Sequence, residues 1–158
     1  NEDGSPDLDF ELNRDEYNGS SILVTRRNFG SGSSREHAVW ALLDYGFRCV
    51  IAPSFADIFH KNCLENGLVP ICLSEDLVDD LTVKSRRHQG YQLSVDLESC
   101  ELGDEAGFRT GFRIHDDIEI HKFRRYCLIN GLDEISLTLQ HEDKISKFEM
   151  SHHPYWQL

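Results

Sequence analysis

Short apolar runs and helical spacings of apolar residues alternate along the first half of the chain. Three apolar runs are typical of buried strands: residues 21–25, 48–52 and 68–73. Between them, apolar residues recur every three or four positions over residues 35–45 and 55–65, which predicts two helices. Gly46 and Asn66-Gly67 follow these spacings and are typical of helix ends. The order strand–helix–strand–helix–strand predicts three parallel strands joined by helical crossovers.

The second half of the chain has a less regular pattern. Three helices are predicted there: residues 75–88, 116–130 and 134–149. Residues 91–97 alternate apolar and polar side chains like a half-exposed strand, and residues 108–114 are predicted to pair with them as a hairpin. One α/β domain over residues 10–158 is the simplest arrangement, preceded by an acidic, flexible arm at residues 1–9.

The composition limits the classes of function. Sixteen Lys and Arg against 28 Asp and Glu give a net charge of −12, which repels phosphate backbones and anionic lipid headgroups. Binding to nucleic acid or to a membrane is therefore disfavoured, and an anionic substrate needs a local concentration of positive charge. No apolar run approaches the ~18 residues of a membrane span, and no signal peptide is recognised. A cytoplasmic protein is expected.

The five cysteines do not indicate a disulfide framework or a metal site. Their number is odd and none forms a C-x-x-C pair: Cys49, Cys63, Cys72, Cys100 and Cys127. Buried, reduced thiols are the simplest explanation. Surface positions are expected for the histidines of the second half: His115, His121, His141, His152 and His153. The basic run at residues 84–88 is expected at a solvated helix end or in an interface.

The loop between the first strand and the first helix carries the candidate chemistry. Gly30 and Gly32 allow a sharp turn and let a ligand approach backbone N–H groups. The first turn of a helix leaves N–H donors unpaired and carries partial positive charge, so this position suits an anion. Ser33 and Ser34 add hydroxyl groups. Arg35 adds a guanidinium group, whose N–H donors can bind both oxygens of a carboxylate.

Several common loop chemistries do not fit these residues. No Gly-Lys-Ser/Thr follows the glycines, Arg35 stands where G-x-G-x-x-G requires glycine, and no serine here is flanked as in the G-x-S-x-G hydrolase elbow. A plain turn is an alternative, with Ser33 or Ser34 capping the helix and with Glu36 and His37 as scaffold. The residues alone leave open a carboxylate site or a capped turn.

Residues 28–38 have the sequence Asn-Phe-Gly-Ser-Gly-Ser-Ser-Arg-Glu-His-Ala. Further motifs accompany this stretch at residues 40–42, 44–47, 50–59, 66–70, 130–135 and 138–140. Together they resemble the small subunit of isopropylmalate isomerase, which corresponds to the swivelling domain of aconitase. The resemblance runs from about Asp7 to the C-terminus, and the Gly-Ser-Ser-Arg-Glu-His core is its most specific part.

The resemblance implies a single α/β domain of the aconitase swivelling type, with three β/β/α layers and a barrel-like shape. It implies a hydro-lyase subunit that isomerises 2-isopropylmalate and 3-isopropylmalate by dehydration and rehydration in leucine biosynthesis. The partner would be a large subunit in a heterodimer. That subunit would hold a 4Fe–4S cluster whose open iron binds a small dicarboxylate substrate, and this chain would bind no cofactor or metal.

The resemblance also implies roles for the residues of the loop. It assigns catalysis to Ser33 and Arg35, substrate binding to Gly32 and Ser34, and supporting roles to Glu36 and His37. Ser33 would remove the proton beside a carboxylate, with its alkoxide stabilised by Arg35 and by the helix N-terminus.

The family pattern also contains an upstream Asn-x-Asp-Thr-Asp segment and a loop that recognises the substrate side chain. This sequence contains neither, so a truncated chain is expected and the substrate side chain is left open. A homoaconitase-like subunit and a non-catalytic anion-binding module are therefore alternatives. A serine hydrolase is disfavoured, because His37 is only four residues from Ser33 and no activated elbow exists.

Overall fold

The structure is a computed structural model that describes Asp7 and residues 9–151. The predicted arm at residues 1–9 lies almost entirely outside the described residues, and so does the tail from residue 152 onward. Two short 3-10 turns precede the first strand: Glu11–Asn13 and Asp15–Tyr17. Within residues 9–151, no helix has the length and apolar character needed to cross a membrane.

Three parallel strands form the central sheet. Their order is β1 (Ile22–Val24), β2 (Cys49–Ala52) and β3 (Val69–Cys72), with β2 paired along both edges. The crossovers between them contain α1 (His37–Tyr45) and α2 (Asp57–Glu65). The predicted strand–helix–strand–helix–strand order and the parallel pairing are confirmed.

Alternate residues of β2 pack into hydrophobic clusters on opposite faces of the sheet. Val50 joins Val39 and Phe59 in the cluster beneath α1 and α2. Cys49 and Ile51 belong to the cluster on the other face. All four residues of β2 are buried, as expected for a parallel strand that is covered on both sides.

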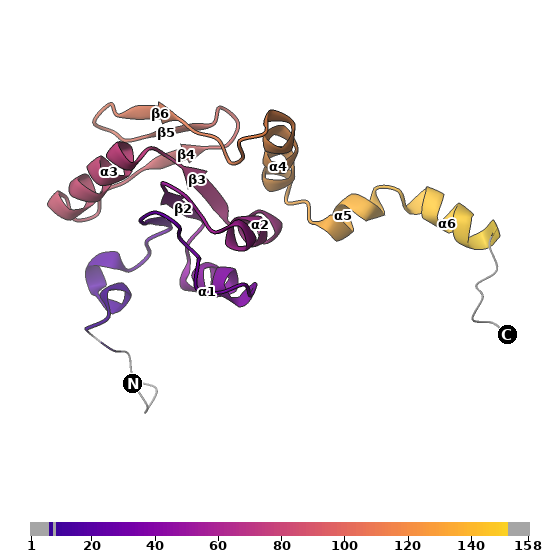
Figure 1. Cartoon of the computed structure of the whole chain (residues 1–158), viewed down its shortest axis with the longest axis horizontal. Coiled ribbons are helices and arrows are strands. Elements are labelled where there is room, and N and C mark those ends of the chain that lie inside the picture. Colours follow the sequence, from indigo (N-terminus) through magenta and orange to yellow (C-terminus); the bar gives the residue numbers. More distant parts are fainter. Residues whose placement is uncertain (1–6, 8, 152–158) are drawn as a thin grey trace.

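The second face of the central sheet is covered by α3 (Glu75–Arg87) and by an antiparallel sheet. That sheet contains β4 (Ser94–Asp96), β5 (Glu101–Gly103) and β6 (Arg109–Gly111). Figure 1 shows the resulting layers: α1 with α2, then the parallel sheet, then the antiparallel sheet with α3. This mixed α/β architecture agrees with the three layers that the family resemblance implies.

The antiparallel sheet corrects the predicted hairpin. β5 is the central strand and pairs with both β4 and β6, so residues 91–97 do not pair with residues 108–114. Leu102 of β5 is fully buried and stands opposite Val95 and Thr110. The strand was missed because Leu102 is its one large apolar residue, which is too little for a periodic signal.

Three helices follow: α4 (Ile118–Asn130), α5 (Glu134–Leu139) and α6 (Glu142–Ser151). The predicted single helix over residues 134–149 is wrong. The His141 N–H bonds to the Thr138 carbonyl three residues back, so the last turn tightens and α5 ends without a Gly or Pro. Figure 1 shows α5 and α6 extending away from the layered body, and neither contains a buried residue in the described part of the chain.

Candidate functional site

The loop that follows β1 is fixed to the segment that follows β2. The Asn28 N–H donates to the Ser54 hydroxyl at 2.9 Å, and the Phe29 N–H donates to the Ser54 carbonyl at 3.0 Å. The Ala56 N–H in turn donates to the Phe29 carbonyl at 2.9 Å. Because carboxyl ends of parallel strands lie at one edge of a sheet, these bonds hold two loops together at the edge where α/β proteins bind ligands.

Gly30 is the glycine that this loop requires. Its φ is +82°, and a Cβ at this position would lie 2.1 Å from Cγ of Phe59. Gly32 has no atom within 4 Å of the corresponding position, so space does not restrict it. The predicted sharp turn therefore depends on Gly30, whereas the backbone at Gly32 is open to a ligand.

Helix α1 begins later than predicted. Its first residue is His37, its N-cap is Glu36, and no side chain caps it. The predicted helix start at Arg35 and the alternative of a Ser33 or Ser34 cap are therefore wrong. Instead, the Ser33 hydroxyl accepts the Arg35 N–H at 3.3 Å, in a local turn before the helix.

The loop presents its polar groups on an open surface. Gly32, Ser34 and Arg35 are exposed, and Ser33 is half-buried. The other arginines of the loop pair with α3: Arg26 with Asp79, and Arg27 with Glu75. Among the described residues, the Arg35 guanidinium forms no ion pair.

Glu36 and His37 connect the start of α1 to other parts of the layer. The Glu36 carboxylate accepts from the Asn66 side-chain amide at 2.8 Å, and the Asn66 oxygen accepts from the Trp40 indole N–H at 2.8 Å. The His37 ring lies 4.7 Å from the Trp40 ring. These contacts tie the loop to the end of α2, which is compatible with the supporting roles predicted for both residues.

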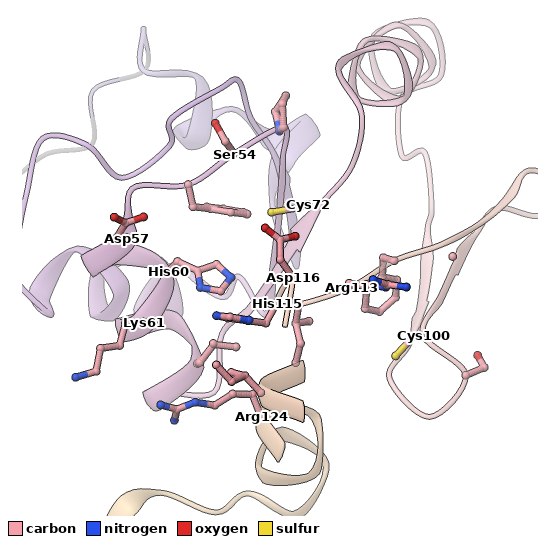
Figure 2. Close-up of a pocket in the computed structure, with 18 residues that line it drawn as sticks. Ser54, Asp57, His60, Lys61, Cys72, Cys100, Arg113, His115, Asp116 and Arg124 are labelled. Atoms are coloured by element: carbon pink, nitrogen blue, oxygen red, sulfur yellow. The ribbon is translucent and has the colours of Figure 1, made fainter. Parts of the chain in front are cut away.

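A cavity of about 1120 Å³ opens beside this loop, and the sequence did not predict it. It lies at the carboxyl ends of β2 and β3, where Ser54 and Cys72 line it, and it continues to His60, His115 and Asp116 (Figure 2). Residues 32–37 do not line it. The predicted loop and the cavity are therefore neighbours that share the Ser54 segment, and not a single pocket.

The cavity contains both signs of charge. Arg113, Arg124 and Lys61 line it together with Asp57 and Asp116. The elements that contribute them are far apart in sequence, so no local motif marked the cavity. The available signal was the group of polar residues at the end of the predicted strand 108–114 and just after it: Arg113, His115, Asp116 and Asp117.

The cavity histidine His60 has a pKa below its ordinary value. Burial lowers the pKa of His60, and the neighbouring His115 lowers it further. A hydrogen bond to the Ile114 backbone, together with the carboxylates of Asp116 and Asp57, opposes this effect on the pKa. The rings of His60 and His115 are 6.2 Å apart.

Two expectations about histidines and cysteines need correction. His121 is buried rather than on the surface, because its Nδ1 accepts the Ile114 N–H at 3.3 Å. Cys72 is exposed and Cys100 is half-buried, whereas the other three cysteines are buried as predicted. His115 is half-buried, and His141 is exposed as expected.

The chain matches two family models. The aconitase C-terminal domain matches residues 1–76, and the C-terminal domain of the 3-isopropylmalate dehydratase small subunit matches residues 134–156. A crystal structure of 3-isopropylmalate dehydratase from Methanocaldococcus jannaschii has a TM-score of 0.58 and 28% identity, covering 80% of this chain and 67% of that chain.

Curated relatives give a closer match. The 3-isopropylmalate dehydratase small subunit of Brevibacillus brevis is 54% identical over 147 residues, which is 93% of this chain and 73% of the relative. The protein of the same name from Paenibacillus polymyxa is 53% identical over 94% of this chain and 80% of the relative. The protein of the same name from Rhodopirellula baltica is 56% identical over 94% of this chain and 73% of the relative. The chain belongs to the family of 3-isopropylmalate dehydratase small subunits.

Proposed function

We propose that this chain is the small subunit of a hydro-lyase that interconverts 2-isopropylmalate and 3-isopropylmalate in leucine biosynthesis. The observation that carries the proposal is 53–56% identity, over 93–94% of the chain, to three relatives named 3-isopropylmalate dehydratase small subunit. The open loop at the carboxyl edge of the parallel sheet supports it, because a small dicarboxylate can reach the polar groups there.

The iron–sulfur cluster belongs to the large subunit in this proposal. When bound there, it would act as a Lewis acid on the substrate hydroxyl and a carboxylate. No three His, Cys, Asp or Glu side chains of the described residues lie together as a metal site, so the side chains present do not fit a cluster. This chain's own residues are therefore assigned only proton transfer and substrate binding.

Ser33 is the proposed base. A serine hydroxyl gives up its proton only where the resulting alkoxide is stabilised. The Arg35 backbone N–H donates to the Ser33 oxygen at 3.3 Å, so one stabilising dipole is in place before substrate binds. The Arg35 guanidinium, which has no ion pair in the described structure, would supply the compensating positive charge.

Ser34, Gly32 and Arg35 are the proposed carboxylate site. All three are exposed, and nothing lies within 4 Å of a Cβ at Gly32, so an anion can approach the backbone. The chain as a whole carries a charge of −12, so its net charge does not attract a dicarboxylate. Hydrogen-bond donors of the loop and the guanidinium group of Arg35 must therefore bind the substrate carboxylate.

The partnership with a large subunit has support in the exposed apolar residues of the C-terminal half. Phe123, Tyr126 and Ile129 of α4 are 43–53% exposed, and Ile135 and Leu139 of α5 are 56–69% exposed. Exposed large apolar side chains on two consecutive helices are compatible with a surface that a partner covers. The proposal includes a heterodimer in the cytoplasm with a small dicarboxylate as substrate.

The barrel-like closure of the family fold is also part of the proposal. Its support is an isolated antiparallel bridge between Cys72, at the end of β3, and Arg113, just after β6. This bridge joins the parallel sheet to the antiparallel sheet at one corner.

Reconstitution tests the proposed function. The chain is mixed with a cluster-loaded large subunit, and turnover is measured with isopropylmalate and with a homocitrate-type substrate. Isopropylmalate turnover should appear only in the mixture. A preference for the homocitrate-type substrate would favour the homoaconitase alternative. Carboxylate binding by the isolated chain, with no activity on mixing, would favour a non-catalytic anion-binding module.

A further inference from the structure

A second group of reactive side chains lies away from the proposed catalytic loop. Cys100 occupies the turn between β4 and β5, is half-buried and lines the cavity. Its φ is +55°, a backbone conformation that is uncommon for residues other than glycine. Phe112 holds this turn in place by donating its N–H to the Cys100 carbonyl at 2.9 Å.

His121 directs an N–H group at the Cys100 sulfur. Its Nε2 lies 3.8 Å from Sγ of Cys100, and its Nδ1 accepts the Ile114 N–H at 3.3 Å. Because Nδ1 uses its lone pair on Ile114, the neutral ring carries its proton on Nε2. His121 is only 7% exposed, so packing restricts the orientation of its ring.

Arg125 provides a second donor to the same sulfur. Its Nη1 lies 3.8 Å from Sγ of Cys100 and also donates to the Glu98 carbonyl at 3.2 Å, which orients the guanidinium. In its neutral form, the thiol of Cys100 donates to the Leu97 carbonyl at 3.5 Å. Two nitrogen donors, on His121 and Arg125, thus face the sulfur and can donate to the thiolate that attacks a disulfide.

The charged side chains that act on His121 are positive, although the cavity also contains Asp57 and Asp116. The side chains whose charge acts on His121 are Arg125, Arg113 and His115, and together with burial they lower the pKa of His121. Arg113 also lines the cavity with Cys100. An anionic reagent that enters the cavity therefore meets cations beside the sulfur.

We propose that Cys100 is a modification site, a reactive thiol that forms mixed disulfides with small carboxylate-bearing disulfides in the cavity. The Cys100 thiolate attacks one sulfur of the disulfide and a new S–S bond forms. The original S–S bond breaks, the departing thiolate takes the electron pair, and the proton of Cys100 goes to water. This reactivity does not depend on the proposed dehydratase function.

Cys72 is an internal control on the same cavity. As a whole residue it is more exposed than Cys100. Burial of its sulfur and the charge of Asp116 raise the pKa of Cys72. Among the described residues, no N–H group donates to the Cys72 sulfur.

The test labels the full chain at pH 7 with a limiting amount of neutral 4,4′-dithiodipyridine, and peptide mass spectrometry locates the adduct. Cys100 should react about tenfold faster than Cys72 or more. Cys100→Ser should remove the fast phase of reaction, and Cys72→Ser should leave it unchanged. Equal rates, or faster labelling of Cys72, would overturn the proposal.

Two variants separate activation of the sulfur from simple access. His121→Asn keeps an acceptor for the Ile114 N–H but removes the donor to Cys100, and Arg125→Met removes the second donor. Each should slow labelling of Cys100 by about tenfold, whereas Arg124→Met, on the same cavity, should not. Unchanged rates in both variants, with native circular dichroism, would refute the role of these donors.

A charged probe tests the preference for carboxylates. The dianionic 5,5′-dithiobis(2-nitrobenzoate) replaces the neutral disulfide, and the ratio of the two rates is compared between Cys100 and Cys72. The anionic-to-neutral ratio should be larger at Cys100, because Arg125 contacts its sulfur whereas the negative charge of Asp116 acts on Cys72. A ratio no larger than that at Cys72 would contradict the proposed class of ligand.

Discussion

At the scale of single residues, the proposed active loop depends on a glycine that is not itself in the proposed site. Gly30 combines a positive φ with close contact to the Phe59 ring, and the neighbouring Phe29 ring packs edge-on to Phe59 at 5.3 Å. These contacts place the loop against the buried face of α2. The polar residues that follow can then remain exposed without the loop losing its position.

Gly30→Ala should destabilise the protein. A positive φ costs about 1 kcal/mol for a residue with a Cβ, and displacing the Phe59 ring adds overpacking of about 1–3 kcal/mol. Gly32→Ala, in the same loop, should change the free energy of unfolding by less than about 1 kcal/mol. Urea unfolding of both variants measures the difference, and equal stability of the two would show that the Phe59 contact does not restrict the loop.

Asp104 is a residue with a buried side chain that links stability to pH. Its side chain is 2% exposed and accepts from the Tyr91 hydroxyl at 2.7 Å and from the Phe108 N–H at 2.8 Å, with the Lys84 ammonium at 3.5 Å. The hydrogen bond from Tyr91, followed by those of Phe108 and Lys84, lowers the pKa of Asp104. Lys84 of the basic run is thus an ion-pair partner and not only a solvated charge.

The sign of the pH effect follows from that lowered pKa. The stabilisation by Asp104 is fully present above the ordinary pKa of 3.8 and is lost as pH falls through the lower value in the folded state. Asp104→Asn should therefore lower the urea midpoint at pH 7 and reduce its decline at acid pH. Asp80→Asn removes only an exposed pair with Lys84, so it should leave the pH profile nearly unchanged. Parallel acid profiles for wild type and Asp104→Asn would exclude this role.

At the scale of elements, the strands and helices of the first half could be predicted because each carries its own signal. β2 is a run of buried apolar residues, α1 ends at Gly46, and Asn66 ends α2. The break between α5 and α6 has no such signal, because residues 140 and 141 are not helix breakers. β5 was missed for a similar reason: its position depends on tertiary pairing and not on its own pattern.

Because β5 is central to the antiparallel sheet, its one buried side chain should be important for stability. Leu102→Ala should cost about 2–5 kcal/mol, the range for large-to-small changes in a core. Val95→Ala, directly opposite on β4 and only half-buried, should cost about 1 kcal/mol. Urea denaturation reports both values, and a loss below about 1 kcal/mol for Leu102→Ala would contradict the central position of β5.

At the scale of the whole molecule, the layers bring distant segments to one edge of the parallel sheet. The loop after β1 was found from its sequence, since Gly, Ser and Arg lie together in one short stretch. The cavity could not be found that way, because His60 and His115 meet only through the packing of α2 against the segment after β6. The Cys100 group is likewise assembled from the β4–β5 turn and α4.

The most direct measurement of the central claim is turnover by Ser33→Ala in the enzyme reconstituted with a cluster-loaded large subunit. Loss of the proposed base should lower kcat by about 10²–10⁴-fold, while size-exclusion chromatography shows unchanged assembly. Ser31→Ala, an exposed serine in the same loop, should keep near-normal turnover. Normal turnover by an assembled Ser33→Ala enzyme would contradict the account.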